Sequence, residues 1–402
     1  MGSIDSTQLG SLDRILKEKV AGKNPQLHNA CFAAIGKEGT LYSAAYGSRD
    51  LAQTQPNTLD SLFWIGSLTK LHTAVAVMIA VGRGLVTLDQ NVREIVPELA
   101  ELDVIEGFEE DGTPRLRKCT APISLRQLLT HTSGFCYDMQ QEKLQRWAAY
   151  VGKKDCGFSG SYSGYLYPLI FEPGEGWAYS PGMDFAGRVI EILTNQDLET
   201  FMRNNIWAPL GMNSTTFRPW TRPDLTENLN QVAHRAVDGS LIKGRVPLGY
   251  PAIDCLGGVG LYSTPADQIK LLSALLGDRA DIISKEGLDE ILRPQLANPA
   301  HFLEVVCGSK RIWLGQTWPV GAQGDFGLSA SINAEAFPGR RAAMSANWSG
   351  MAGIHAWLDR TTGLAGLFVT QILPPGDKPT IDLFLELEAA TYQTYGPCVE
   401  GN

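Results

Sequence analysis

The 402-residue sequence has few of the features that mark nucleic-acid-binding, metal-binding or membrane proteins. Its formal net charge is −9, from 34 basic and 43 acidic residues, so a nucleic-acid backbone or an anionic membrane would repel it. Its seven cysteines and six histidines are scattered, without C-x-x-C or H-x-x-x-H spacing, and predict free thiols and no metal site. The run from Leu71 to Val81 is too short for a membrane span, which needs about 20 residues.

Several common catalytic and nucleotide-binding motifs are also missing. The sequence contains no G-x-S-x-G, which disfavours the nucleophile elbow of the α/β-hydrolases. It contains neither a P-loop nor a G-x-G-x-x-G turn, which removes the simplest nucleotide-binding interpretations. We therefore expect neither a metal nor an organic cofactor.

The N-terminal segment, MGSIDSTQLGSLDRIL, is polar and lacks the continuous apolar core of a signal peptide. This favours an intracellular, cytoplasmic location. The same segment fits the M-G-x-x-x-[ST] pattern for myristoylation of Gly2, but a single acyl chain without a basic patch anchors a protein weakly.

Strand patterns occur at both ends of the sequence, and helical patterns lie mostly between them. A hairpin is predicted around the turn at 36–39, and a strand, a second hairpin and an amphipathic helix are predicted over 342–395. Helices are predicted over 67–83, 125–130, 183–193, 198–206 and 265–276. This order predicts one sheet built from both chain ends (1–75 and 250–402), a mostly helical insert lobe (76–249), and an active site between them.

One short stretch combines a serine with an isolated lysine. Ser67 and Lys70 lie three residues apart at the start of a predicted apolar helix, and Lys70 has no acidic residue within nine positions on either side. Residues at i and i+3 share a helix face, so the amine can reach the hydroxyl. A half-buried lysine loses its proton more easily and can act as a general base. The alternative is an N-capping serine beside an incidental lysine.

Other motifs follow this pair in a recognisable order: GRGLVTLDQNV, ISLRQLLTHTSGF, FEPGEGWAYS, LGGVGLYSTPADQIKLL and NWSG. Together they resemble the serine β-lactamase and penicillin-binding-protein superfamily, in its class C-like esterase and transesterase branch. The agreement spans residues 30 to 370, and within the branch the pattern is most similar to fungal polyketide acyltransferases of the lovastatin type. The resemblance implies an α/β fold of the α+β type, β-lactamase/DD-peptidase-like, with an antiparallel sheet flanked by helices and a mostly helical lobe.

The resemblance also implies catalytic roles. Ser67 matches the acylated nucleophile, Lys70 its proton acceptor, and Tyr179 of WAYS the tyrosine that shares the base work. His131 of THTSG could be mistaken for a base, but in this family it is a structural residue below the site. Tyr179 could otherwise be a packing residue in an aromatic segment.

The NWSG segment matches the edge-strand motif that is K-T-G in lactamases and W-x-G in esterases. The resemblance implies that Trp348, Ser349 and Gly350 bind substrate, and that the amides of Ser67 and Met351 form the oxyanion hole. Trp348 could instead be plain core, and Gly350 a strand bulge. A set of three glycines downstream fits a tight backbone path better than a phosphate site: Gly257, Gly258 and Gly260.

Residues 147–179 hold nine aromatic side chains, about three times the chain average of 9%. The segment has neither a helical nor a strand period. It is either the packing of an irregular loop or an aromatic wall for an apolar ligand. We count Tyr165 of this segment, and Trp64 just before the nucleophile, among the substrate-binding residues.

Two departures from the lactamase pattern affect the expected substrate. Pro181 stands where lactamases have the asparagine of Tyr-x-Asn, and Trp348 replaces the lysine of K-T-G. Both changes remove groups that recognise a β-lactam, so antibiotic hydrolysis is not expected.

The expected function is therefore transfer of an acyl group from an ester or thioester to a hydroxyl of a natural product, through an acyl-Ser67 intermediate. Its partners are a small-molecule acyl donor and acceptor and, by the resemblance, an acyl-carrier domain of a polyketide synthase. Hydrolysis of a related ester is the main alternative, because Ser67, Lys70 and Tyr179 serve both outcomes. A non-acylating cyclase or a binding protein on the same fold remains a further alternative.

Overall fold

The computed structural model describes residues 6–308 and 311–397, so Gly2 lies outside the described residues. Its centre is an antiparallel sheet of seven strands in the order β2-β1-β13-β12-β11-β10-β9. The first two strands come from the N-terminal part of the chain and the other five from the C-terminal part, as predicted. Their bounds are β1 (Asn29–Gly36), β2 (Gly39–Gly47), β9 (Gly324–Phe326), β10 (Ser331–Asn333), β11 (Ala346–Gly350), β12 (Ile354–Asp359) and β13 (Leu364–Val369).

The sheet is covered on both faces, and this explains why β1 is buried throughout and mostly apolar. Alternate side chains of a strand point to opposite faces. Phe32 of β1 joins one core with side chains of α1 (Ser6–Ala21) and α13 (Lys378–Tyr395). Ile35 joins the larger core on the other face, with side chains of α2 (Thr69–Gly82) and α9 (Pro265–Leu276). The predicted fold class is confirmed.

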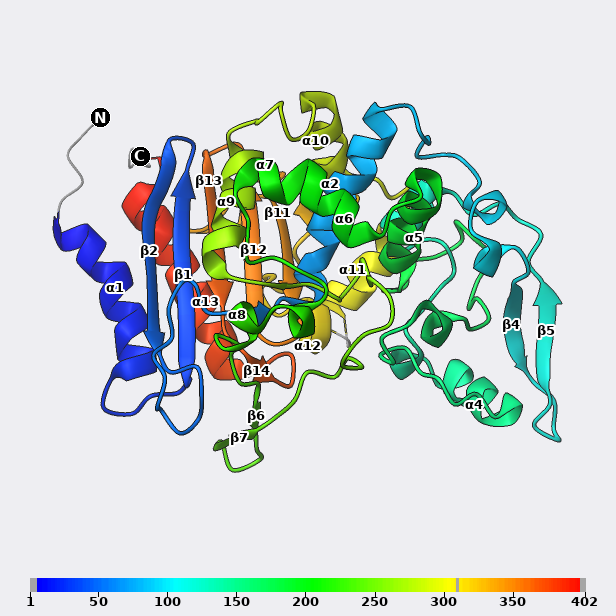
Figure 1. Ribbon diagram of the computed structural model, residues 1–402, viewed down its shortest axis with the longest axis horizontal. Helices are drawn as coiled ribbons and strands as arrows, with labels where there is room; N and C mark the ends of the chain where they lie inside the picture. Colours follow the sequence, from blue (N-terminus) through cyan, green and yellow to red (C-terminus); the bar gives the residue numbers. More distant parts are fainter. Residues whose placement is uncertain (1–5, 309–310, 398–402) are drawn as a thin grey trace.

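The remaining elements lie mainly between β2 and α9 in sequence. Figure 1 shows the strands of the large sheet on one side of the molecule and β4, β5 and α4 at the opposite end. The helices of this part are α3 (Leu125–Leu129), α4 (Glu142–Val151), α5 (Gly182–Thr194), α6 (Leu198–Met202), α7 (Ala208–Leu210) and α8 (Pro223–Thr226), of which α4 and α5 are the longest. The small strands are β3 (Phe63–Trp64), β4 (Asp103–Phe108), β5 (Pro114–Lys118), β6 (Ala233–Arg235), β7 (Leu241–Lys243), β8 (Tyr262–Ser263) and β14 (Ile372–Leu373). The division into lobes at residues 75 and 250 stays a prediction.

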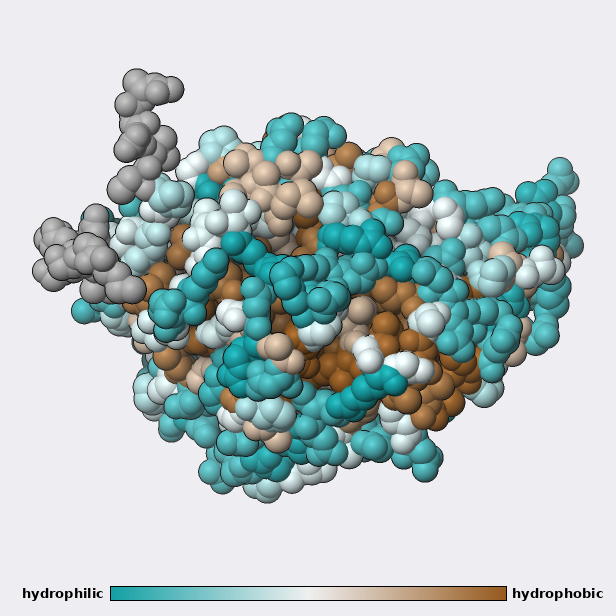
Figure 2. All heavy atoms as spheres, turned by 90° about the horizontal axis from the view of Figure 1, so that it is seen from above, coloured by the Kyte–Doolittle hydropathy of each residue, from teal (hydrophilic) through white to brown (hydrophobic). Residues whose placement is uncertain are grey.

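The bounds of the predicted helices follow the sequence patterns closely, but α1, α4 and several other helices were not predicted. The predicted helix at 198–206 is α6 followed by a π-helical turn, Arg203–Trp207. Three further helices follow α9: α10 (Lys285–Leu292), α11 (Ala300–Cys307) and α12 (Arg311–Leu314). Among the described residues, no helix has both the length and the apolar character needed to cross a membrane. Figure 2 shows a largely hydrophilic face whose hydrophobic residues gather in its middle.

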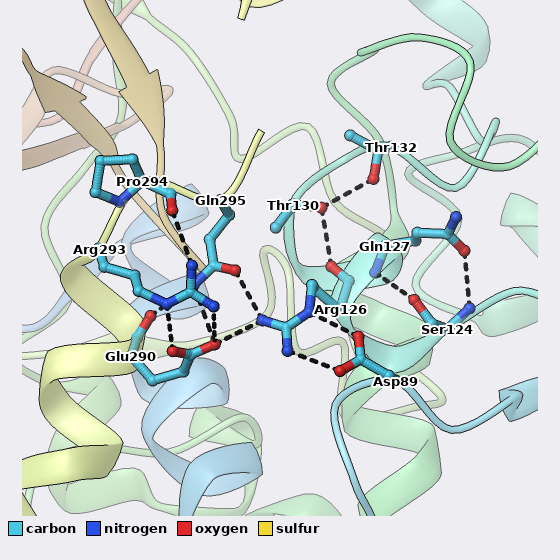
Figure 3. Close-up of polar contacts among 10 residues, drawn as sticks. All are labelled: Asp89, Ser124, Arg126, Gln127, Thr130, Thr132, Glu290, Arg293, Pro294 and Gln295. Atoms are coloured by element: carbon cyan, nitrogen blue, oxygen red, sulfur yellow. Dashed lines mark hydrogen bonds and ion pairs between the residues drawn. The ribbon is translucent and has the colours of Figure 1, made fainter. Parts of the chain in front are cut away.

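A polar cluster around Arg126 joins α3 to α10, which lies far away in sequence (Figure 3). The guanidinium of Arg126 donates to both oxygens of Asp89 at 2.7 and 2.9 Å, to Glu290 at 2.6 Å and to Gln295 at 2.7 Å. Glu290 also accepts two hydrogen bonds from Arg293. Because α3 leads directly to the segment that holds His131, this cluster ties the start of that segment to α10.

Replacing Arg126 with methionine should destabilise the fold by about 1–3 kcal/mol at neutral pH, because the largely buried Glu290 carboxylate loses one of its two cationic partners. Burial alone would raise the pKa of Glu290, but hydrogen bonds from Arg293, Arg126 and Gln295 lower it to about 2 from 4.5. A carboxyl with a lowered folded-state pKa contributes its stability above the unfolded value, and this is lost as pH falls towards 2. Urea unfolding of both proteins should therefore show a difference that shrinks below about pH 4.5.

Arg279→Met is the matched control, because the Arg279–Asp281 pair is about half exposed on both sides. We expect it to leave the unfolding free energy almost unchanged, because exposed ion pairs contribute little to stability. Equal losses for the two variants would contradict the role given to the Arg126 cluster.

Candidate active site

Ser67 lies in a single 3-10 turn, Gly66–Leu68, which leads into α2. The prediction had placed it in the first turn of the α-helix, so the helix begins two residues later than Ser67. Gly66 has a φ of +52°, and a Cβ there would lie 3.3 Å from the amide nitrogen of Met351. Glycine at this position therefore lets the turn that carries Ser67 approach the end of β11.

Lys70 is fully buried in the first turn of α2. Its Nζ lies 3.3 Å from Ser67 Oγ and donates to the carbonyl oxygen of Gly258 at 2.8 Å. The same atom lies 4.7 Å from the centre of the Tyr179 ring. The amine is thus held between the Ser67 hydroxyl, one backbone carbonyl and the rings of Tyr179 and Tyr137.

Tyr179 lies in the extended segment before α5, and its hydroxyl is 2.6 Å from Ser67 Oγ. The edge of the His131 ring packs against the Tyr179 ring, with 4.8 Å between the ring centres. His131 Nδ1 lies 3.0 Å from Ser180 Oγ. Burial, and then the charge of Lys70, lower the pKa of His131 well below its ordinary value. The neutral His131 ring packs against the Tyr179 ring, a contact that fits the structural role expected for His131.

The segment Trp348–Gly350 forms the end of β11 next to Ser67. The prediction of an edge strand is wrong for β11 as a whole, because β11 lies between β10 and β12. However, β10 pairs with only two β11 residues, Ala346 and Asn347. Among the described strands, Trp348–Gly350 therefore has a neighbouring strand on one side only. Its other side faces the Gly66–Leu68 turn that carries Ser67.

Gly350 is required here by close packing. A Cβ at this position would lie 2.3 Å from the carbonyl oxygen of Ile65. Met351 follows directly, outside the strand and partly buried. The backbone of β11 can thus come close enough to the Ser67 turn for amides from both segments to face one reacting oxygen.

Ser67 lies between two recesses. The first is a cleft lined by Ser67, Tyr179, Ser349, Gly350 and Met351, and it extends to Asp377 and Thr380 at the start of α13. The second is mostly apolar and also borders Ser67. Its apolar lining is contributed by Leu68, Leu71, Leu272, Leu292, Ala330, Ala346, Trp348, Ala356, Trp357 and Leu358.

Trp348 has features of both roles considered for it, a substrate-binding residue and a core residue. Its ring is almost buried against Tyr179 and Phe326, with ring centres 5.4 and 5.2 Å away, yet it also lines the apolar recess. It therefore packs the core and shapes the site at once.

Trp64 and Tyr165 do not take the substrate-binding positions predicted for them. Trp64 is 1% exposed, and its indole N–H donates to the carbonyl oxygen of Val259 at 2.7 Å, so it packs behind the nucleophile. Tyr165 is 2% exposed and lies edge-on to Tyr137, with 5.9 Å between ring centres. Most of the aromatic segment is likewise packing: Tyr162, Tyr167 and Trp177 are buried.

The sequence analysis missed two residues beside Lys70. Tyr137 packs against Tyr179 with ring centres 5.4 Å apart. Asp184 of α5 is fully buried and accepts a hydrogen bond from the Gly258 amide at 2.8 Å. The only available signal for Asp184 was an acidic residue in the first turn of an amphipathic helix, a placement that the helix dipole also explains.

The three downstream glycines have the role predicted for them. A Cβ would lie within 3 Å of neighbouring atoms at Gly257, Gly258 and Gly260, so each permits close backbone packing. Among the residues that the structure describes, no group of three or more His, Cys, Asp or Glu side chains could hold a metal ion.

The chemical capacity of the site follows from this geometry. One hydroxyl has two potential proton acceptors within hydrogen-bond reach, Lys70 and Tyr179. Such an arrangement can activate a serine for attack on a carbonyl carbon.

Comparison with known proteins gives one family and a consistent set of relatives. The family model described as beta-lactamase matches residues 12–391. The chain is 31% identical to monacolin J acid methylbutanoyltransferase of Aspergillus terreus, over 98% of this chain and 99% of that protein. It is also 31% identical to lovastatin esterase of Penicillium rubens, over 90% of this chain and 92% of that protein.

Solved structures give the same result. Unliganded simvastatin synthase (LovD) from Aspergillus terreus superposes with a TM-score of 0.90 at 29% identity, covering 99% of this chain and 100% of that one. EstCE1, a hydrolase with promiscuous acyltransferase activity, has a TM-score of 0.75 at 19% identity, which shows a shared fold.

Gly350→Ala should slow labelling of Ser67 by an activated aryl ester by about 100-fold or more, because the Ile65 carbonyl would push β11 away from the Ser67 turn. Intact-protein mass spectrometry against time measures the labelling rate. Gly82→Ala, near the end of α2, is the control, since a Cβ there meets nothing within 4 Å. If Gly350→Ala is labelled as fast as the control, labelling of Ser67 does not need the close approach of β11 to the turn that carries Ser67.

Proposed function

The chain belongs to the beta-lactamase family, and on this premise we propose that it is a serine acyltransferase. It moves an acyl group from an ester or thioester donor, through an acyl-Ser67 intermediate, to a hydroxyl of a natural-product acceptor. The observation that carries the proposal is that Ser67 Oγ lies within hydrogen-bond reach of both Lys70 Nζ and the Tyr179 hydroxyl, at 3.3 and 2.6 Å.

In the acylation step, Ser67 Oγ attacks the carbonyl carbon of the donor while its proton passes to Lys70, assisted by Tyr179. The carbonyl oxygen becomes an oxyanion, and the amides of Ser67 and Met351 donate hydrogen bonds to it. When the tetrahedral intermediate collapses, the bond to the leaving group breaks and the proton is passed to that group. The products of this half-reaction are acyl-Ser67 and the free thiol or alcohol.

The second half-reaction runs the same steps with a new nucleophile. The acceptor hydroxyl approaches the acyl carbonyl, and Tyr179 and Lys70 remove its proton and return it to Ser67 Oγ. Water can replace the acceptor, so transfer competes with hydrolysis in the same site.

The two recesses beside Ser67 fit the two halves of this reaction. The apolar recess suits a short aliphatic acyl chain, because its lining is largely leucine and alanine. The larger cleft carries more polar groups, including Ser349, Asp377 and Thr380, and suits an oxygenated acceptor.

The relatives support transfer and hydrolysis alike. Methylbutanoyltransferases and an esterase are both about 30% identical to this chain, which favours a branched short acyl group and leaves hydrolysis of a related ester as the alternative. A donor carried on an acyl-carrier domain is part of the proposal. Hydrolysis of β-lactams is not, because Pro181 caps α5 without a side-chain amide and Trp348 occupies the position of the family's lysine.

The proposal is tested by the mass of the intact protein after brief exposure to a short-chain acyl thioester. We expect an adduct of one acyl group in the wild type and none in Ser67→Ala. Addition of candidate alcohols should then clear the adduct faster than water does, whereas equal clearance would favour the esterase. An unmodified wild type, even with an activated aryl ester, would overturn the proposal in favour of a non-acylating cyclase or a binding protein.

Filling the apolar recess should change the choice of acyl group. Leu292, at the end of α10, lines this recess and is partly buried, so Leu292→Trp should lower kcat/KM for a branched five-carbon thioester by about tenfold or more relative to an acetyl thioester. Steady-state kinetics with the two donors measure this ratio.

Leu85→Trp is the matched control, because Leu85 is 41% exposed. It should leave the ratio of the two donors unchanged. A Leu292→Trp protein with an unchanged ratio would place the acyl chain outside the apolar recess.

A further inference from the structure

Asp184 is a buried carboxylate beside the site for which the reaction described above has no use. It lies in the first turns of α5 and is fully buried. Its Oδ1 accepts the Gly258 amide hydrogen bond at 2.8 Å, while Oδ2 is buried and has no hydrogen-bond partner among the described residues. An ionised carboxylate in such a place is costly unless a cation compensates it.

Gly258 links this carboxylate to the lysine. The amide of Gly258 donates to Asp184, and the carbonyl of the same residue accepts from Lys70 Nζ at 2.8 Å. A Cβ on Gly258 would lie 2.4 Å from Asp184 Oδ2, so only glycine allows this approach. Any shift of the carboxylate is therefore transmitted to the carbonyl that orients the amine.

Apart from Lys70, the titratable groups that face Asp184 among the described residues are neutral phenols. Tyr137, Tyr162 and Tyr165 interact with it electrostatically, and burial raises the pKa of each phenol well above its ordinary value. The remaining group is Lys70, whose charge favours the ionised carboxylate. The pair therefore consists of one buried acid and one buried amine.

We propose that Asp184 is a positioning residue for Lys70: through Gly258 it orients the amine, and its carboxylate stabilises the ammonium formed when Lys70 accepts the Ser67 proton. This inference rests on the proposed function. In the step concerned, the Ser67 Oγ–H bond breaks, an Nζ–H bond forms, and Oγ bonds to the acyl carbon as the leaving group departs with the proton. Asp184 gains and loses no proton in this cycle.

The role requires Asp184 to be ionised, which gives it a pH signature. Burial raises the pKa of Asp184 to about 6, against the lowering effects of Lys70 and the Gly258 amide. Above this pH the carboxylate stabilises the ammonium, and below it the protonated acid does not.

Asp184→Asn separates charge from geometry, because the asparagine oxygen can still accept the Gly258 amide hydrogen bond. We measure the rate of Ser67 acylation by an aryl acetate for both proteins across pH. The ratio of wild type to variant should be about 10–100 at pH near 8 and fall towards one below about pH 5, where the wild-type acid is itself protonated. Taking the ratio cancels any titration that the two proteins share.

Asp267→Asn is the matched control. Asp267 is also a buried acid in the first turn of a helix, α9, and it accepts the Ser214 amide at 2.8 Å. The ratio of the wild-type acylation rate to the Asp267→Asn acylation rate should stay near one at every pH. A pH-independent ratio for Asp184→Asn would overturn the proposal, since a purely structural role gives that result.

The wild type alone also tests the inference, should Asp184→Asn fail to fold. A wild-type acylation rate that stays level as pH falls through about 6 would overturn it. If wild-type Ser67 is acylated, a pH-independent ratio for Asp184→Asn or a level wild-type rate overturns only this inference, and the proposed function stands. If no Ser67 adduct forms at all, the proposed function and this inference are both overturned.

Discussion

Burial of the Lys70 amine is the constraint on which the site depends. A buried amine must find hydrogen-bond acceptors, and those acceptors must come from chain segments far apart in sequence. Ser67 Oγ supplies one from the turn before α2, and the Gly258 carbonyl supplies the other from the segment before β8. The same contacts bring Ser67, Lys70 and the glycine-rich segment into one arrangement.

The sheet completes this arrangement by presenting a partly unpaired strand. β10 stops after two residues of pairing, so the end of β11 is left open beside Ser67. Glycines at 66 and 350 then let the two backbones approach, where any other residue would bring a Cβ close to Met351 or Ile65. The candidate site is thus built from backbone as much as from side chains, and the Arg126 cluster ties α3, which precedes His131, to α10.

Much of the fold was predictable because its signals are local. The strands at both chain ends, and helices such as α9 over 265–276, follow from hydrophobic periodicity and from turn residues. The spacing of Ser67 and Lys70 likewise predicted a shared helix face. The order of motifs then identified Tyr179, which lies 112 residues from Ser67 and which no local pattern could have paired with it.

Contacts that depend on tertiary packing could not be predicted from sequence patterns. Trp64 and Tyr165 were expected to contact substrate, but burial depth is not readable from an aromatic residue near a motif. Asp184 resembles an ordinary acid at a helix start, and its function as an acceptor for Gly258 appears only once α5 and the glycine segment meet. No local pattern predicts that half of β11 lacks a second neighbouring strand, because this depends on where β10 ends.

The most direct test of this account is a crystal structure of the wild-type protein after reaction with a short branched acyl thioester. The account predicts an ester bond from Ser67 Oγ to the acyl carbon, the carbonyl oxygen facing the amides of Ser67 and Met351, and the acyl chain in the apolar recess beside Leu292. An acyl group attached to a different residue, or an intact donor bound while Ser67 stays unmodified, would contradict it.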